Sequence, residues 1–289
     1  MYDVLIIGAG PAGISAGLYA KRAGANVLIL YYGDSELEKA ERIENYYGFA
    51  DGISGKKLYD AGIQQAINIG IEVKKEEVLD LNKEENIFCV ETENDRYCSK
   101  TVIIATGNKK LKPNIPGINE FEGRGVSYCA ICDGFFFRNK NVVVIGEGNY
   151  ACREAEELKN IVNSVTILTN GQAAKFELKD SENNQIKIDE KKIKEFTGNT
   201  KIEQIKFEDE STMQVDGVFI AIGEASGVDF AKKIGIALNG DSIIADKNMQ
   251  TNIEGLYSAG NVSGGLYQIC KATYEGAIAG MSAAKYVKE

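Results

Sequence analysis

Two cysteines separated by two residues, Cys129 and Cys132, are followed directly by Asp133. A Cys-x-x-Cys pair can close a small disulfide ring, and local positive potential can lower the pKa of its thiols. The chain contains no histidine, so Asp133 is the adjacent candidate acid for a leaving thiolate. These residues favour a redox dithiol. The alternatives are half of a zinc site, although zinc normally takes four ligands, and a pair of inert core cysteines.

Two glycine-rich loops follow apolar runs that are typical of buried strands. In the first, Tyr2–Ile7 leads into Gly8–Gly13, which opens an apolar helix, and Asn26–Tyr32 follows as the next strand. Strand, loop, helix and strand in this order are the context in which such glycines hold a dinucleotide pyrophosphate at a helix N-terminus. The alternative is a glycine turn in a domain without a ligand.

The second loop, Gly146–Ala151, follows the apolar run Asn141–Ile145 but lacks the charges that a nicotinamide dinucleotide needs. Glu147 would place a carboxylate beside a pyrophosphate, where repulsion between unit charges at ~4 Å is on the order of 1–4 kcal/mol. Tyr150 adds bulk where such loops carry a small residue. After the next strand, Thr169–Gly171 offers neither an acid for the ribose of NAD nor a cation for the 2′-phosphate of NADP. We predict that the loop has lost its nicotinamide ligand; the alternative is weak binding despite tolerated substitutions.

The order of these segments predicts an α/β fold with two Rossmann-like, three-layer ββα nucleotide-binding domains. One domain is split into residues 1–112 and 225–289, and the inserted residues 113–224 carry the Cys-x-x-Cys pair. Within the insertion, the alternating stretches Ile186–Ile188 and Ile202–Phe207 suggest antiparallel ribbons.

Composition excludes several classes of function. The net charge of −9, from 33 basic and 42 acidic residues, gives no global support for a nucleic-acid partner. No signal peptide and no apolar stretch of the ~20 residues needed to span a bilayer is present, so we expect a cytoplasmic protein with no membrane partner. Because reducing compartments keep ordinary thiols reduced, no disulfide framework is expected. The cysteines outside the Cys-x-x-Cys pair are expected to be core residues: Cys89, Cys98, Cys152 and Cys270.

Five motifs follow one another in the order found in a known family. They are Gly8–Gly13, Glu44–Gly48, Ala105–Gly107, Cys129–Phe136 and Ala259–Val262. In these motifs the chain resembles the low-molecular-weight flavin thioredoxin reductases over nearly its whole length. The resemblance implies FAD in the split domain, a homodimer, and thioredoxin as partner.

The same resemblance implies roles for individual residues. Cys132 would face the flavin, Cys129 would attack the thioredoxin disulfide, and Asp133 would be the general acid. Residues expected to contact FAD are Gly8, Gly10, Pro11, Ala12, Gly13, Asn45, Ala105, Thr106, Gly107, Gly260, Asn261 and Gln268. Asn261 departs from the Gly-Asp pair usual in the family, but its amide can still hydrogen-bond the cofactor, so FAD is expected to be retained.

The electron donor is the second departure. Members that bind NADPH grip its 2′-phosphate with arginines after the strand that follows the second loop, and here no arginine follows Arg153. The chain resembles the branch of ferredoxin-dependent flavin thioredoxin reductases, which implies reduced ferredoxin as donor. An acidic ferredoxin needs a local basic patch, for which the candidates are Lys109, Lys110, Lys112, Arg138 and Lys140. These side chains are equally well read as solvated linker charges. The alternatives are an NAD(P)H-dependent thioredoxin reductase, a reductase of another thiol carrier, and a redox-sensing flavoprotein without turnover.

Overall fold

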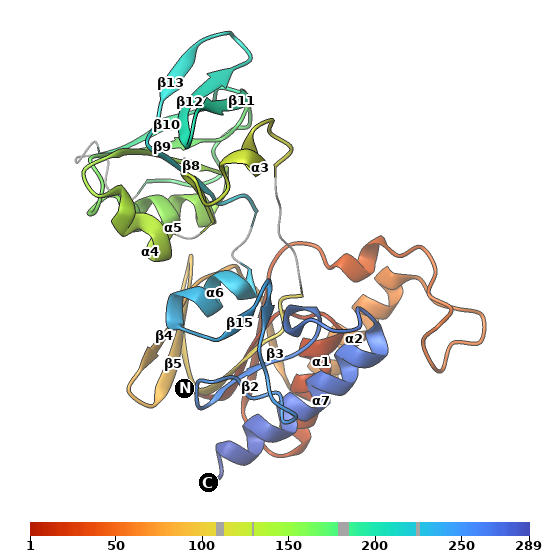
Figure 1. Cartoon of the computed structure of the whole chain (residues 1–289). Coiled ribbons are helices and arrows are strands. Elements are labelled where there is room, and N and C mark those ends of the chain that lie inside the picture. The colour runs from red at the N-terminus through yellow and green to blue at the C-terminus, as the bar shows by residue number, and fades with distance from the viewer. Residues whose placement is uncertain (108–112, 129, 179–184, 224–225) are drawn as a thin grey trace. The chain divides into compact units, whose positions relative to one another are not determined.

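The computed structural model describes residues 1–107, 113–128, 130–178, 185–223 and 226–289, and for residues 131 and 132 the backbone alone. The chain divides into two compact units (Figure 1). The first comprises Met1–Lys109 and Ser226–Glu289, and the second comprises Lys110–Ala225. Each unit contains a sheet with adjacent parallel strands that packs against helices, which confirms the predicted α/β, Rossmann-like fold class.

A seven-stranded sheet forms the centre of the first unit, in the order β3-β2-β1-β6-β5-β4, with β17 also paired to β6. Four strands run parallel to β6, and the first and last of them pair with it directly: β1 (Tyr2–Ile7), β2 (Val27–Tyr31), β3 (Glu72–Lys75) and β17 (Leu256–Ser258). The long strand β6 (Arg96–Ile104) continues into an antiparallel extension formed by β4 (Val78–Glu84) and β5 (Ile87–Thr92). Two short strands, β15 (Leu238–Asn239) and β16 (Ser242–Ile243), form a separate ribbon.

The described residues of this unit form the α-helices α1 (Pro11–Arg22), α2 (Gly55–Asn68), α6 (Gly227–Ile234) and α7 (Ile269–Tyr286). Figure 1 shows α7 alongside α1, and small residues allow the approach: a Cβ on Gly276 or Gly280 would lie 2.1 Å from the carbonyl oxygen of Ala12 or Ala16. The two helices share one core with β1, β2 and β6. Among the described residues, no helix has the length and apolar character required to cross a membrane.

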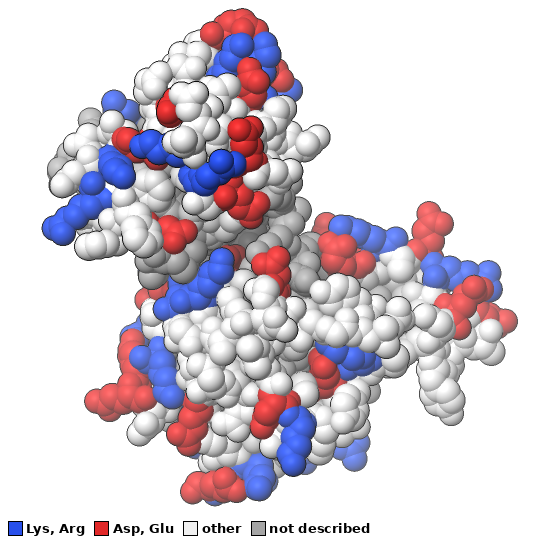
Figure 2. All heavy atoms as spheres, viewed as in Figure 1, with Lys and Arg blue, Asp and Glu red and all other residues white. Residues whose placement is uncertain are grey.

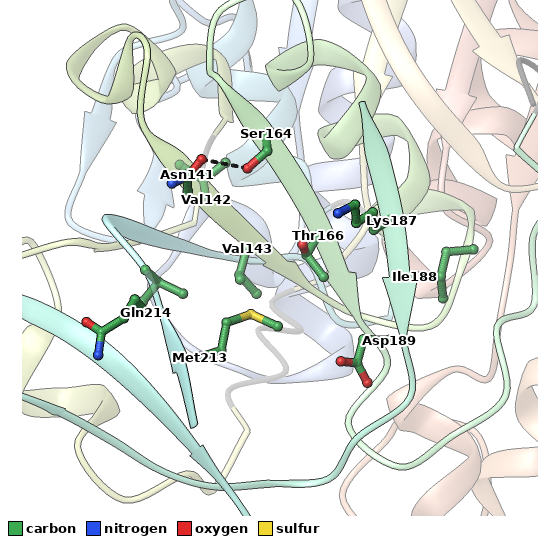
Figure 3. A pocket seen from close by; sticks show the side chains of 11 residues that line it. Asn141, Val142, Val143, Ser164, Thr166, Lys187, Ile188, Asp189, Met213 and Gln214 are labelled. Carbon is green, nitrogen blue, oxygen red and sulfur yellow. Dashed lines mark hydrogen bonds between the residues drawn. The ribbon is translucent and has the colours of Figure 1, made fainter. Parts of the chain in front are cut away.

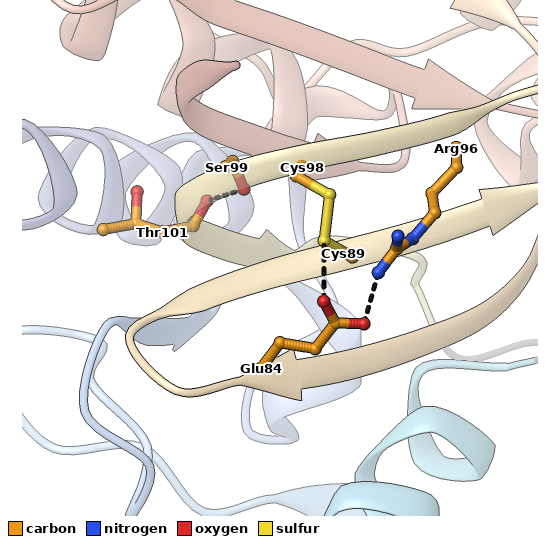
Figure 4. Close-up of a disulfide and its surroundings, with 6 residues drawn as sticks. All are labelled: Glu84, Cys89, Arg96, Cys98, Ser99 and Thr101. Carbon is orange, nitrogen blue, oxygen red and sulfur yellow. Dashed lines mark hydrogen bonds and ion pairs between the residues drawn. A yellow bond between two sulfur atoms is a disulfide. The ribbon is translucent and has the colours of Figure 1, made fainter.

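A disulfide between Cys89 and Cys98 joins β5 to β6 (Figure 4). The two residues are register partners, with Cα atoms 4.2 Å apart, as expected for a close antiparallel pair. Cys89 is buried, as expected, but the expectation that ordinary thiols stay reduced is wrong for these two residues. Strand pairing brings together cysteines that are nine residues apart in the sequence. Cys152 is buried, as predicted, whereas Cys270 is exposed and is not a core residue.

The second unit contains a parallel five-stranded sheet in the order β10-β9-β8-β14-β7. Its strands are β7 (Val126–Ser127), β8 (Asn141–Ile145), β9 (Ser164–Leu168), β10 (Ile186–Asp189) and β14 (Gly217–Ile220). One face packs on α4 (Ala130–Asp133) and α5 (Asn149–Leu158), through Val142 and Val144 of β8. The other face, through Val143 and Ile145, packs on an antiparallel sheet of β11 (Ile193–Gly198), β12 (Ile202–Phe207) and β13 (Thr212–Gln214). Successive residues of β8 thus point to opposite faces.

One predicted ribbon is confirmed and the other is wrong. β12 pairs antiparallel with its neighbours, as predicted. β10 instead runs parallel to β9, with Ile186 opposite Val165. Alternation of apolar and polar residues predicts a strand but not its direction. The direction depends on whether the chain enters β10 beside the beginning or beside the end of β9. The remaining short elements are α3 (Ile118–Phe121), η1 (Glu36–Lys39), η2 (Gly134–Phe137) and η3 (Asn261–Ser263).

Candidate cofactor and dithiol sites

Three segments far apart in the sequence meet at the carboxyl ends of the parallel strands of the first unit. Ile7 and Ser258 are both register partners of Ile104, so the loops that follow β1, β6 and β17 begin side by side. The Ala105 N–H donates to the carbonyl of Ile7 at 2.8 Å, and the Ala259 N–H donates to the carbonyl of Ile104 at 3.0 Å. Ligands of open α/β sheets bind outside this end of the strands.

Two of the three glycines in the first loop, Gly8 and Gly10, are explained by different constraints. Gly8 has a φ of +110°, and a Cβ there would lie 2.4 Å from the carbonyl oxygen of Ala105, so the fold itself requires it. Gly10 has φ −71° and ψ −178°, which any residue can adopt, and a Cβ there would meet nothing within 4 Å. A ligand that approaches the backbone closely is what would require glycine at this position. Pro11 follows at the first position of α1, where its missing N–H costs no helical hydrogen bond.

Two predicted cofactor contacts from opposite ends of the chain lie together. The Asn45 side-chain amide donates from Nδ2 to Oε1 of Gln268 at 3.0 Å, across 223 residues of sequence. Both side chains are exposed, and their other amide atoms, the oxygen of Asn45 and the nitrogen of Gln268, have hydrogen-bonding capacity of their own. At the end of β6, Oγ1 of Thr106 accepts a hydrogen bond from the Gly227 N–H at 3.1 Å.

The turn that follows β17 is the third part of this edge. Gly260 is buried against Ala12, since a Cβ on Gly260 would lie 2.9 Å from Cβ of Ala12. Asn261 begins η3, and it is partly exposed. Sequence reasoning missed Lys271 and Glu275 of α7, which bind the backbone of this turn. They form a Lys–Glu pair four residues apart in a stretch, residues 269–284, that contains no other charged residue, and this pattern is the signal that identifies them.

In the second unit, only part of the Cys-x-x-Cys-Asp segment is described. Cys129 lies outside the described residues, and Cys132 is described by its backbone, within α4. Asp133 is the last residue of α4, and its Oδ2 accepts a hydrogen bond from Oγ of Ser127 at 2.6 Å. The N–H of Ala130 donates to Oε2 of the buried Glu154 at 2.8 Å. Ser127 and Glu154 therefore hold this segment from β7 and from α5, and neither was predicted.

The second glycine loop lies against its own chain. The Lys175 N–H donates to the carbonyl of Glu147 at 2.8 Å, and Nζ of Lys175 lies 3.5 Å from Oε1 of Glu147. The adjacent Phe176 and Leu178 pack on the core beneath α5. Like Gly10, Gly148 has an extended backbone (φ −105°, ψ −178°) that any residue can adopt, and a Cβ there would make an ordinary 3.7 Å contact.

Tyr150 and Asn170, two of the departures from a nicotinamide site, both have structural roles. The Tyr150 side chain is buried in the core that includes Ala130 of α4, so the bulk expected at the loop lies in the core instead. Tyr150, Glu154 and Leu158 are all buried and are spaced by four residues, a helical periodicity that places them on one face. Asn170 has a φ of +54°, and its Oδ1 accepts a hydrogen bond from the Ile193 N–H at 2.8 Å.

A separate cavity of about 390 Å³ lies in the second unit (Figure 3). It is lined by β8, β9, β10 and β13, and includes the polar residues Asn141, Thr166 and Lys187. No predicted site residue lines it. Within the described part of the chain, no group of three or more Cys, Asp or Glu side chains is arranged to hold a metal ion.

Comparison with known proteins places these features in a family. Residues 2–276 match the pyridine nucleotide-disulphide oxidoreductase family. The thioredoxin reductase of Treponema pallidum (strain Nichols) is 36% identical over 300 residues, which span 99% of this chain and 97% of the relative.

Two solved structures are also similar. The atypical thioredoxin reductase TRi from Desulfovibrio vulgaris Hildenborough has a TM-score of 0.90 and 38% identity, covering 99% of this chain and 97% of that one. A ferredoxin-flavin thioredoxin reductase from Clostridium acetobutylicum has a TM-score of 0.69 and 30% identity, covering 98% of this chain and 97% of that one. Since these matches extend over nearly the whole length of both proteins, the chain belongs to the pyridine nucleotide-disulphide oxidoreductase family and, within it, to the thioredoxin reductases.

Proposed function

We propose that this thioredoxin reductase reduces the disulfide of thioredoxin through FAD and the Cys129–Cys132 dithiol, and that its electrons come from reduced ferredoxin. The observation that carries the choice of donor is the second glycine loop, where Glu147 is held by Lys175 of the same unit. The first loop, by contrast, has open space beside Gly10. On this proposal the chain retains a dinucleotide site in the first unit and lacks one in the second.

The residues at the first site fit FAD. The Gly8–Gly13 loop and the N-terminus of α1 would hold the pyrophosphate, and Asn45, Asn261 and Gln268 would offer amides to the flavin and its ribityl chain. When bound, FAD accepts electrons singly and passes them on in pairs. The protein orients it through backbone and amide groups at the carboxyl edge of the sheet.

The dithiol performs the thiol–disulfide exchange. The Cys129 thiolate attacks one sulfur of the thioredoxin disulfide, which forms a mixed disulfide and releases the other sulfur as a thiolate. Asp133 gives that thiolate a proton, and the hydrogen bond from Ser127 orients the carboxyl group. Cys132 then attacks Sγ of Cys129, which closes the Cys129–Cys132 disulfide and releases reduced thioredoxin.

Several features of the second loop disfavour a nicotinamide donor. Glu147 would face a pyrophosphate, and the chain near Lys175 lies on the loop. The turn at Asn170 is bound to β11 instead of presenting a cation. Among the similar structures, the protein from Clostridium acetobutylicum carries the name of a ferredoxin-flavin thioredoxin reductase. Ferredoxins near −400 mV and thioredoxin near −270 mV leave a gap of ~130 mV, which is about 6 kcal/mol for two electrons.

A surface on η2, which directly follows Asp133 in the sequence, fits an acidic protein partner. Phe135 and Phe136 are 67% and 71% exposed. The Arg138 guanidinium lies 6.0 Å from the ring centre of Phe135, and Nζ of Lys140 donates to the carbonyl of Phe136 at 3.1 Å. The other basic candidates, Lys109, Lys110 and Lys112, lie outside the described residues. Basic and acidic side chains are interspersed over the face seen in Figure 2. An acidic partner would therefore be recognised by a local group of basic side chains and not by the charge of a whole face.

A nicotinamide donor is the second candidate, and Gly148 favours it. The fold does not require glycine at this position, so close approach of a pyrophosphate is one reason to keep it. Curated relatives such as that of Treponema pallidum are named thioredoxin reductases without a donor.

We also propose a homodimer. Tyr47 is 99% exposed on a segment where the rings of Tyr46 and Phe49 stack with centres 6.2 Å apart. We place the contact on this group of neighbouring aromatic side chains, which are exposed or partly exposed, because contiguous exposed apolar side chains mark protein–protein contact surfaces. Light scattering coupled to gel filtration is expected to give twice the chain mass of 31.5 kDa, and a Tyr47→Ser variant is expected to dissociate more readily. A monomeric parent protein would contradict this proposal.

Steady-state turnover tests the proposed function. We expect thioredoxin reduction with reduced ferredoxin and negligible reduction with NADPH or NADH. Cys132→Ser is expected to retain FAD and lose turnover, while trapping a mixed disulfide through Cys129. Turnover at the parent rate in Cys132→Ser would show that the dithiol assignment is wrong. Faster turnover with NADPH than with ferredoxin would favour the second candidate.

A further inference from the structure

Two side chains in the amino-terminal part of α7 form hydrogen bonds with the turn that follows β17. The Lys271 ammonium donates to the carbonyl of Gly260 at 2.9 Å, to the carbonyl of Gly264, and to Oε2 of Glu275 at 2.8 Å. An ammonium group has three donors, and here each has an acceptor. Lys271 thus spans the turn from its first residue to its last.

Glu275, on the next turn of the helix, binds the same turn through its carboxylate. Its Oε2 accepts the Gly260 N–H at 2.8 Å as well as the Lys271 ammonium. Both polar groups of the Gly260 backbone are thereby engaged by one ion pair. A second bond, between the hydroxyls of Ser258 and Ser263 at 2.7 Å, closes the base of the turn.

The ion pair is shielded from solvent. The side chains of Lys271 and Glu275 are 15% and 13% exposed. Removing one partner of a buried pair leaves an uncompensated charge, which is strongly unfavourable. The geometry of the turn therefore depends on both residues.

The turn from Gly260 to Gly264 lies at the carboxyl ends of the parallel strands, where we propose that FAD binds. Gly260 is in contact with Ala12 near the start of α1, and Asn261 follows it directly. α7 itself begins just after Gln268, whose amide is bound to Asn45. A displacement of the turn would move Asn261 relative to the first glycine loop.

We propose that Lys271 and Glu275 are a positioning pair, which holds the turn from Gly260 to Gly264 in the conformation that binds FAD. The inference rests on the proposed function, because it requires FAD in the first unit. Neither side chain needs to touch the cofactor. The pair acts through the Gly260 backbone and places the Asn261 side chain.

The experiment measures the Kd of FAD for apoprotein by the change in flavin fluorescence on reconstitution, together with thermal unfolding of the apoprotein. Lys271→Met is expected to weaken FAD binding about 10- to 100-fold, from the loss of one or two charge-assisted hydrogen bonds. Lys271→Arg, which retains the charge, is expected to recover part of the affinity. If Lys271→Met does not fold, Glu275→Gln carries the test, with weaker binding expected because the ion pair is lost.

A matched control lies on the same helix and its carboxyl-terminal extension. Lys285 and Glu289 form a pair with the same four-residue spacing, but they are 78% and 66% exposed. Lys285→Met is expected to leave the Kd of FAD unchanged. A Lys271→Met or Glu275→Gln variant that binds FAD as tightly as the parent would overturn the positioning role. Failure of the parent chain itself to bind FAD would overturn the proposed function, and so separates the two outcomes.

Discussion

At the scale of single residues, the side chains that hold the dithiol segment in place are different from the side chains that indicate its redox chemistry. Cys129, Cys132 and Asp133 are identified by their spacing. Ser127 and Glu154, which hold Asp133 and Ala130, are identified by the fold. Serine and glutamate are common residues, and their role becomes visible when β7 and α5 bring them to the same segment.

Glu154 gives the first prediction. Replacing it by leucine leaves the N–H of Ala130 without its buried acceptor, which costs about 1–3 kcal/mol of unfolding free energy. Glu154→Gln keeps an acceptor oxygen and should recover most of that loss. Urea unfolding of the purified variants measures both effects, with the partly exposed Glu156→Leu as control. Equal stability of the leucine and glutamine variants would argue against the contact.

Tyr257 gives a prediction for alkaline pH. Burial, with a smaller effect of the neighbouring Tyr286, raises the pKa of Tyr257 to about 12. Below pH 10 the phenol is protonated in both states, and its contribution to stability is fully present. Between about pH 10 and 12 the unfolded chain loses a proton that the folded chain keeps, so stability falls by roughly 2 kcal/mol from this group.

Replacing Tyr257 by phenylalanine removes this part of the pH dependence. Unfolding free energies measured at intervals from pH 9 to 12 should therefore decline less steeply in Tyr257→Phe than in the parent. Parallel curves for the two proteins would show that the phenol ionises equally in both states.

At the scale of elements, the sequence predicts the parts that depend on local patterns and misses those that depend on pairing. Tyr2–Ile7 and its glycine loop are found as predicted, because a buried strand and a helix start have local signals. The parallel direction of β10 and the Cys89–Cys98 disulfide depend on which strand edge is adjacent. The buried face of α5 at Tyr150 follows helical periodicity, a signal that a site-based interpretation of the loop overlooked.

The disulfide between β5 and β6 gives a further prediction. Closing a short loop of about ten residues is expected to add about 3 kcal/mol to stability by restricting the unfolded chain. A Cys89→Ala/Cys98→Ala variant should therefore unfold at a lower denaturant concentration than the parent. Mass spectrometry after alkylation without reductant should find Cys89 and Cys98 linked to each other. Full alkylation of both cysteines in the untreated protein would contradict the pairing.

At the scale of the whole molecule, two units of the same fold class differ in the surroundings of their glycine loops. In the first, the fold leaves space at Gly10 at an edge where segments from three parts of the chain meet. In the second, Glu147 and Lys175 bind the loop to its own chain, and Asn170 binds the following turn to β11. This difference is the basis for our proposal that the thioredoxin reductase has one dinucleotide site and takes its electrons from a protein.

The most direct measurement of this claim is anaerobic absorption spectroscopy of the bound flavin, with stoichiometric NADPH, NADH and reduced ferredoxin added in turn. The flavin absorbance should remain oxidised after NADPH and NADH, and it should bleach rapidly after reduced ferredoxin. Rapid bleaching by NADPH would contradict the claim, since it would show that the loop at Gly146–Ala151 still binds and orients a nicotinamide.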